Sequence, residues 1–271
     1  MDANLGGSAE AISASELAEI GLRYEVDGAI ATITLDRPDK RNAQTFATWS
    51  ALARIGEHIP DQVRIVVVKG EGPSFSAGID LRMFTPEGVP GQGSFVSAAS
   101  LGETTFERRI ADAQRGFLWL RRPDIVSIAA VHGHAIGAGF QLALACDLRV
   151  VAEDVKFCMK EPALGLVPDL TGTKPLVELV GLPRAIELCL TARVVGAEEA
   201  VRLGLAELAV PAGELAQAVQ DLAGALLATD RGAATATKRL LQGALGRSLE
   251  EQAIAERREQ IVRIRTLFAS G

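Results

Sequence analysis

The chain has 271 residues, of which 48% are hydrophobic and 23% charged, so it is long and apolar enough to bury a sizeable core. Its formal net charge of −6 argues against a basic surface for nucleic acid. The three cysteines include no CxxC pair, which excludes a disulfide framework or a zinc site from the prediction.

The first 20 residues are small and polar, and we expect a flexible tail there. This segment has neither the basic start nor the apolar core of a secretory signal. No run of about 18 apolar residues occurs in the chain, so no membrane span is predicted. We therefore expect a cytoplasmic protein without a membrane partner.

The next segments predict a hairpin, a helix and a buried strand. Two β-rich runs, Leu22 to Val26 and Ile30 to Leu35, flank an Asp-Gly pair, which is typical of a tight hairpin. Residues 42 to 59 have helical spacing of apolar side chains. Residues 63 to 69 form a continuous apolar run, which indicates a strand covered on both faces.

Further along, strands continue to alternate with helices. Residues 85 to 105 predict an irregular segment, and a helix is predicted over residues 106 to 120. Buried strands are predicted over residues 125 to 131 and 148 to 152. This alternation predicts parallel βαβ units and an α/β fold. Because the pattern turns helical after residue 176, we divide the chain into a tail (1–20), an α/β core (21–195) and a C-terminal helical region (196–271).

Two glycine turns follow buried strands, one at residues 76 to 80 (SAGID) and one at residues 135 to 139 (AIGAG). The second turn runs straight into a helix, whose dipole adds partial positive charge. Two convergent N–H groups in such turns would form an oxyanion hole. Purely structural turns explain the spacing equally well. The glycine fingerprints of dinucleotide and phosphate-binding loops are both absent.

Four segments carry a family resemblance: ITLDRPDKRNAQT, GPSFSAGIDL, IVSIAAVHGHAIGAGFQLALACDLRVVAEDVKF and EPALGLVPDLTGTKPLVELVGLPRAIELCLTARVVGAEEAVRLGLAELAVP. Over residues 22 to 268 the chain is similar to the enoyl-CoA hydratase/isomerase (crotonase) family. The resemblance implies a superhelical core of repeated ββα units and an acyl-CoA substrate. It implies no metal or redox cofactor, and trimers that commonly pair into hexamers.

The resemblance also assigns the binding groups. It places the oxyanion hole at the backbone N–H groups of Ile79 and Ala138. Ala138 stands where the family often has glycine, so its φ has to be negative. The residues expected to contact CoA lie in two loops and are Arg37, Lys40, Arg41, Ala77 and Asp80. An ordinary solvated loop is the alternative for the basic residues.

The carboxylates decide the expected reaction. Family hydratases resemble one another in carrying two glutamates, at the positions of Gln141 and Glu161, so one carboxylate is missing here. A single carboxylate is enough to move a double bond, because it can take a proton from one carbon and return it to another. Family Δ3-Δ2-enoyl-CoA isomerases resemble this chain in keeping an acid only at the Glu161 position. We therefore expect an isomerase, with hydratase and a catalytically silent acyl-CoA binder as alternatives.

A further acid, Asp169, widens the range of reactions that the resemblance implies. Family dienoyl-CoA isomerases have acids at the Glu161 and Asp169 positions, and a family dehalogenase uses an aspartate at the Asp169 position as its nucleophile. Neither matches fully. We expect Glu161 and Asp169 to be catalytic and Gln141 to lie in the substrate pocket. A purely structural interpretation gives Glu161 a helix-terminal role and makes Asp169 a helix cap.

Several features have structural interpretations. The two histidines at residues 132 and 134 are expected to be hydrogen-bonded, and Asp147 and Arg149 to form an ion pair or cap. The Ala-, Leu- and Val-rich C-terminal helices indicate apolar surface for oligomerisation. Family members usually continue past Phe268 with a last helix, so contacts from such a helix are expected to be missing.

Overall fold

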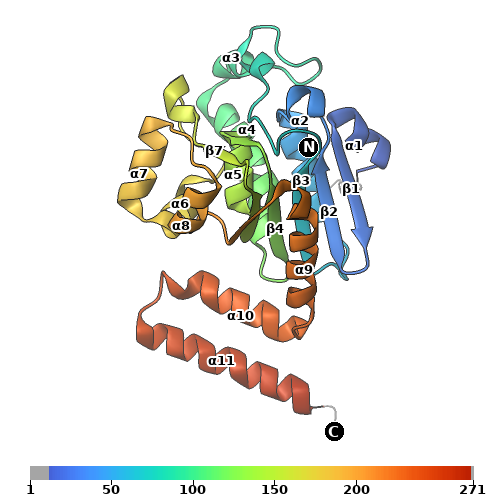
Figure 1. Cartoon of the computed structure of the whole chain (residues 1–271), viewed down its shortest axis with the longest axis vertical. Helices are drawn as coiled ribbons and strands as arrows, with labels where there is room; N and C mark the ends of the chain where they lie inside the picture. Colours follow the sequence, from blue (N-terminus) through green and yellow to red (C-terminus); the bar gives the residue numbers. More distant parts are fainter. Residues whose placement is uncertain (1–11, 270–271) are drawn as a thin grey trace, which may run out of the picture.

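A six-stranded sheet forms the centre of the computed structural model, which describes residues 12–269 (Figure 1). The strand order is β1-β2-β3-β4-β6-β8, with β1 antiparallel to β2 and all other neighbours parallel. The strands are β1 (Leu22–Asp27), β2 (Ile30–Leu35), β3 (Ile65–Gly70), β4 (Val126–Val131), β6 (Leu148–Ala152) and β8 (Leu208–Val210). A second, two-stranded parallel sheet pairs β5 (His134–Ile136) with β7 (Lys156–Cys158).

Both faces of the central strands are buried, as the apolar runs predict. Alternate side chains of β3 and β4 enter one hydrophobic cluster, including Val66 and Val68, and the residues between them enter another, including Ile65 and Val67. The first cluster packs under α2 and α4, and the second under α9. The α/β prediction is therefore confirmed, and so is the hairpin, in which Gly28 has φ 55°.

Helices cover both faces of the sheet. They are α1 (Ala14–Ile20), α2 (Phe46–Glu57), α3 (Phe95–Ala99), α4 (Glu103–Leu118), α5 (Ala138–Ala145), α6 (Thr173–Val180), α7 (Leu182–Thr191), α8 (Ala197–Leu203), α9 (Leu215–Leu227), α10 (Arg231–Ala244) and α11 (Leu249–Phe268). Single 3-10 turns span Pro38–Lys40, Leu81–Phe84, Trp119–Arg121, Glu161–Leu164 and Ala212–Glu214. None of these helices is long and apolar enough to cross a bilayer within residues 12–269.

The N-terminal tail prediction is wrong for residues 14–20, which form α1. Ser13 and Glu16 make a reciprocal capping box at its start, and Leu17 is buried in the main core. One buried leucine and one cap are therefore enough to dock a short helix that composition alone does not reveal. The first 11 residues of the predicted tail lie outside the described residues.

The region after residue 195 is not helical throughout. Strand β8 extends the main sheet by pairing with β6, and α9 covers the second face of that sheet. The C-terminal helical region is therefore made of α10 and α11, which form a hairpin set apart from the main body (Figure 1). Lys238 fastens α10 to the body through the carbonyl oxygens of Arg122 and Ile125 and the carboxylate of Asp147.

Asp147 and Arg149 do not form an ion pair with each other, but the predicted alternative of a cap is present, because Arg149 Nη1 donates to the carbonyls of Ala143 and Cys146 at the end of α5. Asp147 pairs with Lys238 at 2.6 Å, and the buried Arg149 pairs with Glu207 at 3.0 Å. Residues distant in sequence thus supply both partners.

Candidate active site

The two glycine turns lie directly against each other. Ser76 donates its N–H to the carbonyl of His134 at 2.8 Å, and Ile136 donates its N–H to the carbonyl of Ser76 at 3.0 Å. These two bonds form a parallel bridge between Ser76 and Ala135. The turn after β3 and the turn before α5 are thus held together through their backbones.

Gly78 makes the closest approach between the turns. Its φ is 95°, and a methyl group built on it would lie 2.6 Å from the carbonyl oxygen of Ile136 and 3.7 Å from the amide nitrogen of Ala138. Only glycine fits this position without strain. Because Gly78 directly precedes Ile79, the amide of Ile79 lies on the part of the first turn that is closest to the Ala138 amide.

Both candidate oxyanion donors are free. The backbone N–H of Gln44 donates to the carbonyl of Gly78, and the backbone carbonyl of Gln44 accepts from the N–H of Asp80. This pairing leaves the Ile79 N–H on the other side of the chain. Ala138 is the first residue of α5, where the N–H has no acceptor within the helix. Within residues 12–269, neither N–H donates a hydrogen bond. The negative φ required of Ala138 is confirmed.

A buried carboxylate faces the second turn. Glu161 begins the 3-10 turn after β7 and is 4% exposed. A methyl group built on Gly137, which has φ 51°, would lie 3.1 Å from its Oε1 and 3.5 Å from its Oε2. Oε1 accepts a hydrogen bond from Gln141 Nε2 at 2.7 Å, while Oε2 is buried without a partner among the described residues. A buried carboxylate oxygen without a partner is costly, which makes Glu161 a candidate functional residue.

Burial raises the pKa of Glu161, and the charge of Asp169 raises it further, against the opposing hydrogen bonds from its own backbone and from Gln141. Burial also raises the pKa of Asp169. Both carboxyl groups therefore exchange protons closer to neutral pH than ordinary acids do, as proton-transfer groups in active sites require.

Gln141 lies wholly inside the protein and uses both ends of its amide. Its Oε1 accepts the N–H groups of Leu170 at 2.9 Å and Gly172 at 3.3 Å, while its Nε2 donates to Glu161. The structure therefore places Gln141 next to the predicted carboxylate, but in contact with the protein on each side.

Asp169 does not cap a helix. Helix α6 begins after Gly172 without a side-chain cap, and within the described residues no other residue donates a hydrogen bond to the Asp169 carboxylate. Instead its backbone carbonyl accepts a bond from Gln114 Nε2 at 2.7 Å, which fixes the loop against α4. The carboxylate is left available and electrostatically coupled to Glu161.

The residues predicted to bind CoA divide into two kinds. Asp80 is buried and pairs with Arg37 at 3.0 Å and with Arg82 at 2.8 Å. Hydrogen bonds from Arg82 and Arg37 hold the pKa of Asp80 far below its ordinary value, so its charge stabilises the loop.

The other predicted contacts are accessible. Lys40 and Arg41 are exposed on the turn after β2, and the N–H of Ala77 donates to the carbonyl of Arg41 at 2.8 Å. This bond places the basic turn next to the Ile79 turn.

Two residues that sequence reasoning did not assign support the first turn. Asn42, with φ 56°, donates to the carbonyls of Glu71 and Ser74. Gln44 donates to Ser76 Oγ at 3.1 Å and accepts from Trp49 Nε1 at 2.8 Å. Both stand in the segment RNAQT. In the sequence, the only signal is that both are polar residues between a predicted strand and a predicted helix. In the structure both are buried, so their hydrogen bonds hold the first turn in place.

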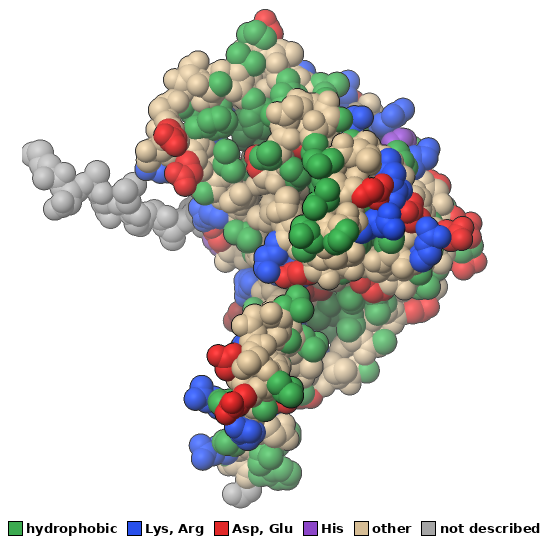
Figure 2. All heavy atoms as spheres, turned by 90° about the vertical axis from the view of Figure 1, so that its left-hand side faces the viewer, with side chains coloured by type: hydrophobic (Ala, Val, Ile, Leu, Met, Phe, Trp, Pro, Cys, Tyr) green, Lys and Arg blue, Asp and Glu red, His purple; other side chains and the backbone are tan. Residues whose placement is uncertain are grey.

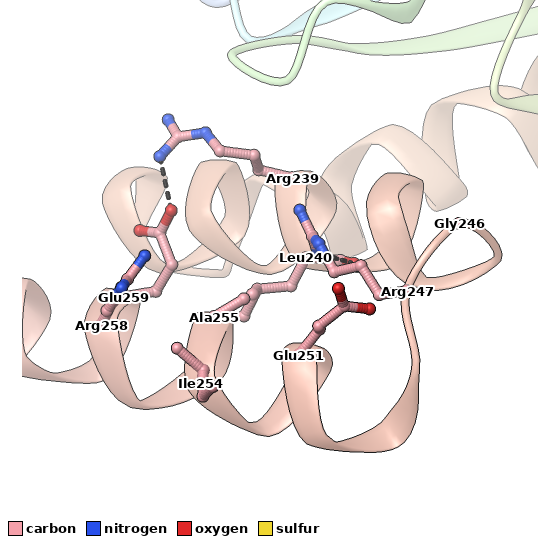
Figure 3. A pocket seen from close by; sticks show the side chains of 9 residues that line it. All are labelled: Arg239, Leu240, Gly246, Arg247, Glu251, Ile254, Ala255, Arg258 and Glu259. Carbon is pink, nitrogen blue, oxygen red and sulfur yellow. Dashed lines mark hydrogen bonds and ion pairs between the residues drawn. The ribbon is translucent and has the colours of Figure 1, made fainter.

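A cavity of about 510 Å³ lies away from these residues, between α10 and α11 (Figure 3). Arg239 and Glu259 pair across it at 2.7 Å, and Glu251 belongs to the capping box of α11. Its acids are thus engaged in ion pairing and capping. No group of three or more potential metal ligands gathers anywhere within residues 12–269. The Glu161 site is therefore the candidate active site.

Comparison with known proteins identifies relatives over nearly the whole chain. The enoyl-CoA hydratase/isomerase family model matches residues 25–264. A Rhodobacter capsulatus protein assigned as an enoyl-CoA hydratase is 33% identical over 239 residues, 88% of each chain. Carnitinyl-CoA dehydratase of Escherichia coli K12 is 36% identical over 202 residues, 73% of this chain and 70% of that enzyme.

Solved structures give the same picture. A Thermobifida fusca YX protein, assigned as an enoyl-CoA hydratase and solved with CoA, is 56% identical with a TM-score of 0.92, covering 97% of this chain and 99% of that one. Its complex with acetoacetyl-CoA is likewise 56% identical, with a TM-score of 0.90, and covers 94% and 99%. The crotonase-like fold is thereby confirmed.

Proposed function

The chain belongs to the enoyl-CoA hydratase/isomerase family, and from that premise we propose that it moves a double bond along the acyl chain of an enoyl-CoA. The observation that carries this proposal is the buried Glu161 carboxylate, whose Oε2 is unpartnered beside the Ala138 turn. One buried carboxylate next to a pair of free amides is enough for a 1,3-proton shift.

The proposed chemistry uses two parts of the site. The N–H groups of Ile79 and Ala138 hold the thioester oxygen while it gains negative charge. Glu161 removes a proton from C2 of a 3-enoyl thioester, and the electrons move into a dienolate. The protonated Glu161 then returns the proton to C4, which leaves the 2-enoyl thioester and the original carboxylate. This proton transfer needs neither a metal ion nor a redox cofactor.

Hydration is the second candidate, because named relatives are assigned as hydratases or as a dehydratase. Adding water needs a base for the water and an acid for C2. Gln141 cannot act as the base or as the acid, because an amide takes up no proton and both ends of this amide are hydrogen-bonded to the protein. In this alternative Asp169 is the second proton-transfer group, in keeping with its coupling to Glu161.

A substrate panel distinguishes the two reactions. The protein is incubated separately with trans-2-, trans-3- and 2,4-dienoyl-CoA, and products are followed by mass and ultraviolet absorbance. Unchanged mass with a moved chromophore supports isomerisation, whereas a gain of one water supports hydration. Binding of the thioesters without conversion of any of them would contradict both and favour a silent acyl-CoA binder.

We propose that the CoA part of the substrate lies along the exposed Lys40 and Arg41, while Arg37, Ala77 and Asp80 shape the loop beneath it. The bound CoA of the Thermobifida fusca relative supports this class of ligand. Calorimetric titration should show binding of acyl-CoA and none of NAD, with affinity reduced by the double substitution K40A/R41A. Unchanged affinity would exclude the basic turn from the binding surface.

We also propose that the chain forms a homotrimer or a dimer of trimers. Large apolar side chains are exposed on two surfaces (Figure 2), namely Leu182, Ile186, Leu190 and Val194 around α7 and Leu241, Leu245, Leu249 and Phe268 on the C-terminal hairpin. Such surface is usually covered by a partner. A monomer mass that does not change with concentration in light scattering would refute this proposal.

A further inference from the structure

Gln141 connects two segments that carry the candidate proton-transfer groups. On one side its Nε2 donates to Oε1 of Glu161 at 2.7 Å. On the other its Oε1 accepts two backbone N–H groups from the loop that follows Asp169, at residues 170 and 172. The amide therefore bridges the two acidic segments through its own donor and acceptor.

The fit around Gln141 is tight. All eight residues of α5 are buried, and a methyl group built on Gly172 would lie 2.7 Å from Gln141 Cγ. Thr171, between the two bonded amides, has φ 70°, a conformation that a β-branched residue adopts only when its surroundings hold it. The bridge thus holds a strained loop in one position.

We propose that Gln141 is a positioning residue, whose amide fixes one oxygen of Glu161, leaves the other free for substrate, and locks the Asp169 loop to the same point. This inference rests on the proposed role of Glu161 and goes beyond it. It assigns Gln141 a donor role that a glutamate at this position could perform only in its protonated form.

A direct consequence concerns Gln141→Glu. A carboxylate there still accepts the two loop amides, but it faces Glu161 across the present 2.7 Å contact, where two negative charges cannot both persist. The pair then retains one proton, and the acid limb of activity moves to higher pH. In this chain the substitution therefore takes away the ionised Glu161 that the proposed isomerisation uses near neutral pH.

The other ionisable groups coupled to Glu161 are Asp169 on the loop, Cys158 at the end of β7 and Cys189 on α7. Gln141→Glu keeps an acceptor for the two loop amides and so leaves these groups in place, whereas Gln141→Met also releases the loop that follows Asp169. A shift in the titration of Glu161 would therefore report the lost amide or the added charge.

The test compares Gln141→Glu and Gln141→Met with the wild type, and each of these three proteins has a counterpart that also carries Glu161→Gln. The Glu161 carboxyl is titrated by infrared difference spectroscopy between each single variant and the same variant carrying Glu161→Gln. This titration needs no substrate, so it stays decisive even if the wild type converts no enoyl-CoA and the proposed function fails. The pH profile of kcat/KM is measured in parallel.

We expect Gln141→Glu to raise the Glu161 titration by at least about one pH unit, because of the new like charge. Gln141→Met removes the hydrogen bond without adding charge, so it should raise the titration by less. In both, kcat should fall with KM nearly unchanged. The double substitution Gln141→Glu/Glu161→Gln restores a matched donor and acceptor and should fold as stably as the wild type, but should not recover turnover.

Three results would overturn the proposal. The first is an unshifted Glu161 titration in both single variants. The second is faster hydration by Gln141→Glu, which would make this position a water-activating site. The third is wild-type turnover by the double substitution, which would show that the place of the carboxylate is immaterial. Gln141→Met guards against misfolding of the charged variant, since it adds no buried charge.

Discussion

Replacement of Glu161 by glutamine tests the proposed chemistry most directly. The substitution is nearly isosteric, and its side-chain oxygen can still accept the bond that Gln141 Nε2 now donates to Oε1. Its amide group would occupy the place of Oε2, which has no protein partner among the described residues. Packing and the loop bonds of Gln141 should therefore survive, while the ability to carry a proton is lost.

The expected loss of turnover follows from the role of Glu161 in proton transfer. Positioned proton transfer contributes about 10²–10⁴-fold to rate. This corresponds to about 3–5 kcal/mol of transition-state stabilisation. The two amide donors at Ile79 and Ala138 are untouched, so acyl-CoA affinity should change little.

Glu161→Gln should lower turnover but raise the thermal stability of the chain at high pH. Because the pKa of Glu161 is raised in the folded chain, the folded state binds more protons than the unfolded state above the ordinary value of 4.5. The wild type therefore loses stability as pH rises through that window, and Glu161→Gln does not. We expect the variant to melt at a higher temperature than the wild type at pH 8, with the difference disappearing near pH 4.

The assay pairs turnover on the accepted enoyl-CoA with thermal unfolding at several pH values. Glu153→Gln is the matched control, since Glu153 is exposed and should leave both measurements unchanged. Full turnover by Glu161→Gln would refute the assignment of the catalytic carboxylate. A loss of turnover together with lower stability at pH 8 would instead indicate a structural role.

Three further predictions concern residues around the site and the hairpin. Asp169→Asn removes the charge that raises the pKa of Glu161, so the acid limb of kcat/KM should move to lower pH, with a rate loss below about 10²-fold. Gly78→Ala forces a methyl group against the facing turn at positive φ and should cost about 1–3 kcal/mol in thermal unfolding and much of the turnover. Lys238→Met leaves Asp147 without its cation and should reduce the free energy of unfolding in urea by about 3 kcal/mol.

Each of these predictions has a control or a contradicting result. An unmoved acid limb in Asp169→Asn would show that the two acids are independent. Gly102→Ala should be harmless, because Gly102 has negative φ and open space around a built methyl group. Lys174 is exposed and gives the matched Lys174→Met control. Equal effects at both lysines would contradict the role of Lys238 in holding α10 to the body.

The sequence predicts those parts of the fold whose signals are local. Apolar runs and an Asp-Gly pair identify the hairpin and the central strands, because these residues bury both faces of a sheet or turn tightly wherever they stand. Strand β8 escapes prediction, since three residues at its place are held by pairing with β6 and not by their own pattern. Helix α1 escapes for a similar reason, because one buried leucine docks it.

The candidate site also has parts that the sequence predicts and parts that depend on contacts between distant residues. Glu161, Ile79 and Ala138 follow from family resemblance, and the structure adds the burial of Glu161 and Ala138 and the free hydrogen-bonding groups of all three. The bonds of Gln141 join residues 20 to 31 positions apart, and no spacing rule predicts them. A side chain that looks like a missing carboxylate in sequence is a two-sided bridge in three dimensions.

The position of β8 also has a consequence for the nascent chain. Its partner β6 ends at residue 152, and roughly 55 residues, including both catalytic candidates, are synthesised before β8 begins. At about 5–20 residues per second, the edge of β6 waits about 3–11 s on the ribosome for its native neighbour. During that interval a buried, apolar strand presents open backbone groups to other nascent chains. Slow synthesis over residues 153–207 should therefore favour aggregation, and a chaperone that shields strand edges should relieve it.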